Sequence, residues 1–204
     1  CAADTAAAPF ELPEITVIST TPVGGTGIAE DKYPGNVQII NQRDLPQSAQ
    51  SLPDVLNELV GAVNVNSTQG NPSVVDLNYR GFTASPVLGT PQGISVFLDG
   101  MRVNEPFGDI VSWDLIPQIA IANITLVPGS NPVYGLNTLG GAVSINTKSG
   151  FAFPGGSAKL TLGSAARRSL DAEVGGHKDN TDYYVATSVT ANVKGGFNHE
   201  VQRG

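Results

Sequence analysis

The chain has 204 residues, of which 40% are hydrophobic and 14% charged, and its formal net charge at pH 7 is -7. An acidic chain without a cluster of Lys and Arg excludes a nucleic-acid partner held through phosphate contacts. No apolar run reaches the roughly 18 residues that a membrane-spanning helix needs, so no such helix is predicted.

Charge and proline content change along the chain. Thirteen of the 14 prolines lie at or before Pro132, and through Lys148 there are 13 acidic residues against 5 basic ones. After Lys148 there are 6 basic and 5 acidic residues, and a single proline. Because proline cannot donate to a β-ladder, the later part suits long paired strands. We therefore predict a flexible first segment at 1–35, a compact domain at 36–150 and a strand-rich part at 151–204.

The first segment contains a short β-prone peptide among small residues, proline and glycine. It consists of Glu14, Ile15, Thr16, Val17 and Ile18, with no apolar partner nearby in the sequence. Two interpretations stay open. The peptide either adds itself to the edge of another protein's sheet or forms an ordinary edge strand of this domain.

Cys1 is the one cysteine, so no disulfide bond forms within the chain. A cysteine at position 1 is a candidate for lipidation after lipoprotein processing. The alternative is that the sequence simply begins at this residue.

A helix is predicted at 51–61. Ser51 is a suitable N-cap, Asp54 follows three residues later, and Pro53 falls in the first turn, where its missing N–H costs nothing. An apolar stripe follows, and Gly61 is a typical stop. The stripe consists of Val55, Leu56, Leu59 and Val60.

The rest of the compact domain predicts short strands and one further helix. Asp99-Gly100 between alternating apolar residues indicates a tight β-hairpin. A short helix is expected after Asp114, through 116–121. The predicted strands are 63–65, 75–79, 94–98, 101–103, 124–127 and 142–147. This mixture predicts a small α+β domain whose mixed sheet has about four strands.

The strand-rich part alternates apolar and polar residues over 157–164, 169–174 and 183–194. A polar turn is predicted at 175–180. Strands of about ten residues with one apolar and one polar face are what a membrane barrel needs. A soluble sandwich has the same alternation, so the pattern alone leaves both open.

Several segments, in order, resemble the TonB-dependent outer-membrane receptors. The peptide at 14–17 resembles the TonB box, and Tyr79-Arg80-Gly81-Phe82 is similar to the family's "RGF". The longest similarity joins Ile116-Pro117, the strand at 124–127 and the run Gly140 to Lys148, which together resemble the signature of the plug domain. Where the family usually carries Glu and Arg in this signature, the chain has Thr125 and Pro128.

The resemblance implies a plug followed by the first antiparallel strands of a transmembrane β-barrel of about 22 strands. It implies an active transporter of the bacterial outer membrane, with its N-terminus in the periplasm and its plug in the barrel lumen. The partners would be TonB of the inner-membrane energy-transducing complex, outer-membrane lipid, and a small-molecule or chelate cargo. An iron–siderophore-like chelate is the first candidate cargo, with cobalamin, other metals and carbohydrates as the alternatives, and no cofactor is expected.

The resemblance also implies roles for individual residues. The peptide at 14–18 would couple to TonB by strand pairing. Cargo would bind apical loops at 82–92, 104–113 and 130–139. The candidate binding residues are Phe82, Asn104, Glu105, Phe107, Asp109, Trp113, Asn131 and Tyr134. Arg80 and Arg102 are the candidates for plug–barrel contact.

An enzyme is not predicted, because the sequence has no nucleophile elbow, P-loop or CxxC motif. The two histidines, His177 and His199, both lie in the strand-rich part, so neither a metal site nor a catalytic triad is expected. The alternative to a transporter is a stand-alone plug-like subunit that binds but does not transport. Three or so strands cannot close a barrel, since an open edge in lipid leaves backbone groups unpaired. We therefore expect the chain to be a fragment of a longer one.

Overall fold

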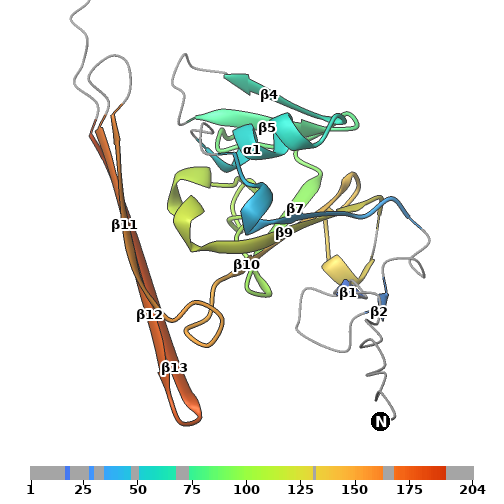
Figure 1. Ribbon diagram of the computed structural model, residues 1–204. Helices are drawn as coiled ribbons and strands as arrows, with labels where there is room; N and C mark the ends of the chain where they lie inside the picture. The colour runs from blue at the N-terminus through green and yellow to red at the C-terminus, as the bar shows by residue number, and fades with distance from the viewer. Residues whose placement is uncertain are drawn as a thin grey trace, which may run out of the picture.

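The computed structural model describes residues 17–18, 28–29, 35–46, 51–67, 74–130, 132–162 and 168–191. Within these residues, the predicted domain at 36–150 contains two sheets and one α-helix, and the predicted strand-rich part forms a third sheet (Figure 1). The fold class is therefore as predicted, a plug-like mixed domain followed by antiparallel strands.

The central sheet has five strands in the order β3-β9-β10-β7-β8. Their bounds are β3 Gln38–Asn41, β7 Ile94–Leu98, β8 Met101–Arg102, β9 Ile121–Pro128 and β10 Gly141–Thr147. β10 runs parallel to β7, and the other neighbours are antiparallel. The sheet has five strands where about four were expected, because it includes both of the short edge strands, β3 and β8.

A second, antiparallel sheet has the order β4-β5-β6. It consists of β4 Val63–Ser67, β5 Val75–Tyr79 and β6 Phe82–Ala84. The helix α1, Leu52–Leu59, comes just before β4. As predicted, Ser51 is the N-cap, and its hydroxyl accepts from the Asp54 amide at 3.4 Å.

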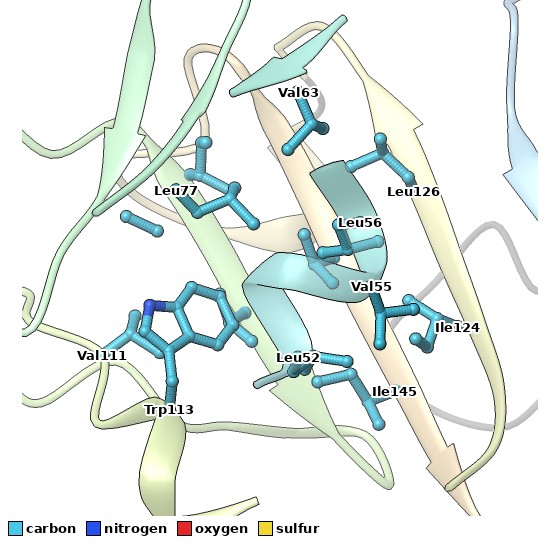
Figure 2. Close-up of a cluster of buried hydrophobic side chains, with 14 of the residues drawn as sticks. Leu52, Val55, Leu56, Val63, Leu77, Val111, Trp113, Ile124, Leu126 and Ile145 are labelled. Atoms are coloured by element: carbon cyan, nitrogen blue, oxygen red, sulfur yellow. The ribbon is translucent and has the colours of Figure 1, made fainter. Parts of the chain in front are cut away.

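The main core lies between α1, the second sheet and one face of the central sheet (Figure 2). Leu52, Val55 and Leu56 of α1 pack toward Ile124 and Leu126 of β9 and Ile145 of β10. These strand residues share a face because every second side chain of a strand points the same way. The opposite face carries a smaller cluster that includes Phe97, Val127 and Tyr134.

The predicted hairpin forms between β7 and β8. Asp99 has φ 47° and Gly100 has φ 81°, as a two-residue turn with left-handed central residues requires. The Asp99 carboxylate also accepts from the backbone amide and hydroxyl of Thr147, at 2.7 and 2.8 Å. The hairpin is thereby joined to the last residue of β10.

The helix expected through 116–121 is wrong. The structure instead has two 3₁₀ turns, η3 Trp113–Leu115 and η4 Gln118–Ala120, and Ile121 already begins β9. Pro117 explains the interruption, because it lacks an N–H and disfavours helical geometry at the residue before it.

The third sheet consists of β11 Gly155–Leu162, β12 Arg168–Lys178 and β13 Thr181–Ala191, all antiparallel (Figure 1). The turn expected at 175–180 is confined to Asp179 and Asn180, and β12 continues through Gly175 and Gly176. These glycines let another part of the backbone approach the strand, as described below.

Candidate functional site

The three loops predicted to be apical meet at one end of the central sheet. The Val111 amide donates to the Ser85 carbonyl at 2.9 Å, which joins loop 104–113 to loop 82–92. The amides of Leu139 and Gly140 both donate to the Gly93 carbonyl, at 3.1 and 2.8 Å. The loops therefore form one continuous surface, at the end of β9 and the beginnings of β7 and β10.

Asp109 holds two of these loops together. Its carboxylate pairs with the Arg102 guanidinium at 2.8 Å. It also accepts a hydrogen bond from the side-chain amide of Asn137 in loop 130–139. Asp109 and Asn137 both have positive φ, 54° and 60°. A short polar side chain tolerates this backbone better than most residues.

Asn104 is buried beneath this surface. Its side-chain oxygen accepts from the Val96 amide at 2.7 Å, and its amide donates to the Ile94 carbonyl at 3.1 Å. Both partners belong to β7, so Asn104 extends the hydrogen bonding of that strand. Its predicted role in cargo binding stays a prediction, since the side chain is enclosed in this conformation.

We expect Asn104→Ala to lower the stability of the plug-like domain by about 1–3 kcal/mol, because it leaves buried groups of β7 without partners. Amide hydrogen exchange of β7 in the full-length protein measures this loss. The matched control is Asn64→Ala, at an exposed position of β4. Equal effects of the two substitutions would contradict a structural role for Asn104.

The predicted binding residues differ widely in accessibility. Phe107 is 79% exposed, Glu105 is exposed and Asp109 is half-buried. Trp113, by contrast, is 3% exposed within the main core, and Tyr134 is buried edge-to-face against Phe97. Of these five residues, Phe107, Glu105 and Asp109 present side-chain surface in this conformation.

Phe82 and Asn131 complete the set. Phe82 is half-buried, and a Cβ atom at Gly93 or Gly140 would collide with its ring. The ring therefore packs between loop backbones and helps to fix their spacing. Asn131 lies outside the described residues. The binding roles of all eight residues stay predictions.

An ion pair connects the plug-like domain to the third sheet, with its lysine buried and its glutamate half-buried. Lys148 directly follows β10, and its ammonium lies 2.7 Å from the Glu173 carboxylate of β12. The Lys148 side chain is only 1% exposed. Its ammonium also lies 5.0 Å from the centre of the Phe153 ring, within the range of a cation–π contact.

Glu173 collects further donors on the same face of the sheet. The hydroxyl of Ser157 donates to it at 2.8 Å, and the hydroxyl of Tyr184 donates to it as well. Tyr184 also reaches the Ile119 carbonyl of η4 at 3.4 Å. We call Lys148, Glu173 and Tyr184 the join cluster, because it connects β10 and η4 to β12 and β13.

The linker after Lys148 packs against the glycines of β12. A Cβ atom at Gly150 would collide with backbone carbonyls of Gly176 and Tyr183. The Gly150 amide donates to Asp182 at 3.1 Å, and the Phe151 ring stacks on His177 with centroids 5.0 Å apart. Close backbone approach thus explains the glycine pair that the sequence suggested to be a turn.

The third sheet has one apolar and one polar face. The register places Leu160, Leu170 and Val189 side by side, and all three are exposed. The polar face carries Glu173 of the join cluster and Asp171, which accepts from Ser188 at 2.6 Å. The join cluster connects the plug-like domain to this polar face.

The two arginines predicted to contact a barrel, Arg80 and Arg102, are not part of the join cluster. Arg80 is exposed in the β5–β6 turn, 5.2 Å from the centre of the Tyr79 ring. Arg102 pairs with Asp109 within the plug-like domain. Their predicted contacts stay predictions. The sequence reading missed Lys148 as a contact residue, although the lysine ends the plug signature and Glu173 lies on the polar face of the next strand but one.

Part of the predicted coupling peptide is described. Val17–Ile18 forms β1 and pairs antiparallel with β2, Ile28–Ala29. Glu14, Ile15 and Thr16 lie outside the described residues, as does Cys1.

Within the described ranges, no group of three or more His, Cys, Asp or Glu side chains is placed to hold a metal ion. The helices of the same ranges include none with the length and apolar character needed to cross a membrane.

Known proteins similar to this chain are receptors and transporters. A family model, the TonB-dependent Receptor Plug Domain, matches residues 29–142. The Vitamin B12 transporter BtuB of Vibrio cholerae is 29% identical over 137 residues, 66% of this chain and 21% of that protein. The BtuB of Vibrio vulnificus is 28% identical over 58% of this chain and 18% of that protein. The chain thus spans about a fifth of the length of these relatives.

Solved structures show the same fold at lower identity. The alcaligin outer membrane receptor FauA of Bordetella pertussis has a TM-score of 0.61 and 14% identity, over 87% of this chain and 30% of that chain. The ferric yersiniabactin uptake receptor FyuA of Yersinia pestis has a TM-score of 0.53 and 15% identity, over 78% of this chain and 24% of that chain.

The family match covers more than half of the chain, and residues 29–142 include most of the predicted motifs and most of the two-sheet domain. Its relatives are receptors and transporters rather than enzymes. The predicted location, the outer membrane with the plug in the barrel lumen, is that of the family. The chain belongs to the TonB-dependent receptor plug domain family.

Proposed function

We propose that this chain is the plug and the first barrel strands of an active transporter that takes up a scarce nutrient across the outer membrane. An iron–siderophore-like chelate is the first candidate cargo. In this proposal residues 1–35 carry the coupling peptide, 36–150 form the plug and 151–204 begin the barrel.

The join cluster is the observation that carries the proposal. A lysine at the end of the plug is buried against the polar face of a sheet whose other face exposes leucines and valines. Barrels of the outer membrane have this alternation, with an apolar outward band and a polar interior. The plug thus contacts the face that would line the lumen, and the opposite face would contact lipid.

The β12–β13 turn indicates which end of the third sheet would face the periplasm. This turn has two residues, and the linker from the plug packs close to it through Asp182 and His177. Short turns of such barrels face the periplasm. The linker would then lie on the periplasmic side, and cargo would reach the loops at 82–92, 104–113 and 130–139 from the other end of the lumen.

Coupling to TonB would use the peptide at 14–18. A peptide that pairs with the edge of another sheet gains affinity from its main-chain hydrogen bonds. Proline at a central position removes one donor and disfavours pairing. Val17→Pro should therefore uncouple transport without removing any part of the loop surface.

Uptake of a radioactive ferric chelate into cells that produce the full-length protein tests the proposal. We expect accumulation in cells with TonB, and only surface binding in cells without TonB or with Val17→Pro. Ala7→Pro, in the small-residue stretch that precedes the peptide, is the matched control and should accumulate normally. Accumulation that persists without TonB would contradict the proposal.

A further inference from the structure

The plug has few basic residues, and this limits the cargo that it can hold. Between positions 36 and 148 there are eight acidic residues and four basic ones. The basic residues are Arg43, Arg80, Arg102 and Lys148. A polyanionic ligand is normally held by several cationic side chains that converge on it.

Two of the four basic side chains are already paired with carboxylates. Arg102 is 2.8 Å from Asp109, and Lys148 is 2.7 Å from Glu173 in the join cluster. Breaking either pair to bind an anion would take the cationic partner from a carboxylate and leave it only neutral hydrogen-bond donors. Neither residue is therefore free to hold an anionic cargo.

The other two basic residues do not converge on the loop surface. Arg43 lies in η2, Gln42–Asp44, which directly follows β3. β3 pairs with β9 so that Asn41 lies opposite Asn123, at the end of the sheet away from the loops. Arg80 lies in the β5–β6 turn beside the Tyr79 ring. Among the described residues of the plug, Arg80 is thus the one arginine near the loops that has no carboxylate partner.

The loop surface itself is acidic and apolar. The loops at 82–92, 104–113 and 130–139 contain no Lys or Arg, and Glu105 and Asp109 are their only charged residues. Asp109 is neutralised by Arg102, whereas Glu105 is exposed. Phe107 and Leu88 are 79% and 54% exposed, and a Cβ atom at Gly108 would collide with Leu88. Leu88 therefore lies against the loop backbone beside Phe107, and Glu105 is two residues before Phe107 in the same loop.

We infer that this surface receives an uncharged or cationic cargo with apolar or aromatic surface, and discriminates against polyanionic chelates. The inference rests on the proposed transport function and narrows its substrate class. Burial of Phe107 and Leu88 against the cargo supplies a favourable apolar contribution. A cationic group gains further from Glu105 and from the face of the Phe107 ring. A trianion is repelled by Glu105 and finds no cationic cluster on the plug.

Binding of three ferric chelates to the purified full-length protein tests this inference. The probes are an uncharged cyclic trihydroxamate chelate, a linear trihydroxamate chelate with one free ammonium, and a trianionic tris-catecholate chelate. Isothermal titration calorimetry gives the three dissociation constants. We expect the uncharged or the cationic chelate to bind at least about tenfold more tightly than the trianion, a difference of about 1.4 kcal/mol.

A charge reversal on the loop surface sharpens the test. Glu105→Lys should reduce several-fold the ratio of the dissociation constant of the trianion to that of the uncharged chelate. The reason is that the substitution replaces repulsion of the trianion with attraction. Glu58→Lys makes the same change at an exposed position of α1 and should leave the preference unaltered. Thermal unfolding of both variants should match the parent protein.

The outcomes separate this inference from the proposed function. Tightest binding of the trianion, equal binding of all three chelates, or no binding of the uncharged and cationic ones would overturn the inference. TonB-dependent uptake of the trianion would overturn it while leaving the transport proposal intact. Binding with the expected preference but without uptake in any cell would support the inference and sink the transport proposal.

Discussion

Replacing Glu173 with Gln is expected to destabilise the contact between the plug and the third sheet by about 3 kcal/mol. The reason is that the Lys148 side chain, which is only 1% exposed, then lacks its carboxylate partner. Removing one member of a buried ion pair costs more than the pair itself contributes. Glutamine keeps the shape of the side chain, so the loss comes from the charge rather than from a cavity.

Differential scanning calorimetry of the full-length protein measures this effect as a lower temperature for the unfolding transition of the plug. Asp171→Asn is the matched control, because Asp171 lies on the same face and accepts from Ser188 within the third sheet. Its effect should stay below about 1 kcal/mol, as for other surface charges. Adding Lys148→Met to Glu173→Gln should recover much of the loss, since no buried charge is then left unpaired. If Glu173→Gln behaves like Asp171→Asn, the join cluster does not hold the plug.

Trp113→Ala is expected to lower the stability of the plug by about 3–5 kcal/mol, as large-to-small substitutions in cores do. The indole packs in the main core beside Val111 (Figure 2). Its removal leaves a cavity that the surrounding strands can fill only in part. Amide hydrogen exchange of β9 and β10 reports this loss as a smaller free energy of local opening.

Phe107→Ala, in the same loop as Trp113, is expected to affect cargo binding rather than stability. Its ring is largely exposed, so the substitution should change stability by no more than about 0.5 kcal/mol. If the loop surface binds cargo, affinity falls in Phe107→Ala and the fold remains intact. If the Trp113→Ala variant is as stable as the parent protein and loses only cargo binding, the placement of the Trp113 indole in the core would be wrong.

Local chemistry predicted much of the fold. Ser51 and Asp54 marked the beginning of α1, and Asp99-Gly100 marked the β7–β8 hairpin, because each depends on residues next to each other in the chain. The helix expected near 116–121 failed because Pro117 interrupts an apolar stretch that otherwise has helical spacing. The five-stranded order of the central sheet depends on pairings between distant segments, which no local pattern encodes.

The candidate site was predicted less well, and for a physical reason. Aromatic residues in loops suit both binding and packing, and only the tertiary structure separates exposed Phe107 from buried Trp113 and Tyr134. Lys148 and Glu173 are 25 residues apart, so their ion pair follows from how the linker folds back onto β12. The glycines at 175 and 176 indicated a turn, whereas their function in the structure is to admit the linker backbone.

We propose that the plug is joined to the wall of a closed barrel. The most direct test is the apparent mass of the protein extracted from outer membranes, on gels run with and without boiling. A closed barrel has no unpaired strand edge and resists unfolding in detergent until heated. We expect a species much heavier than 21.1 kDa whose mobility changes on boiling. A species near 21.1 kDa whose mobility is the same before and after boiling would contradict the claim.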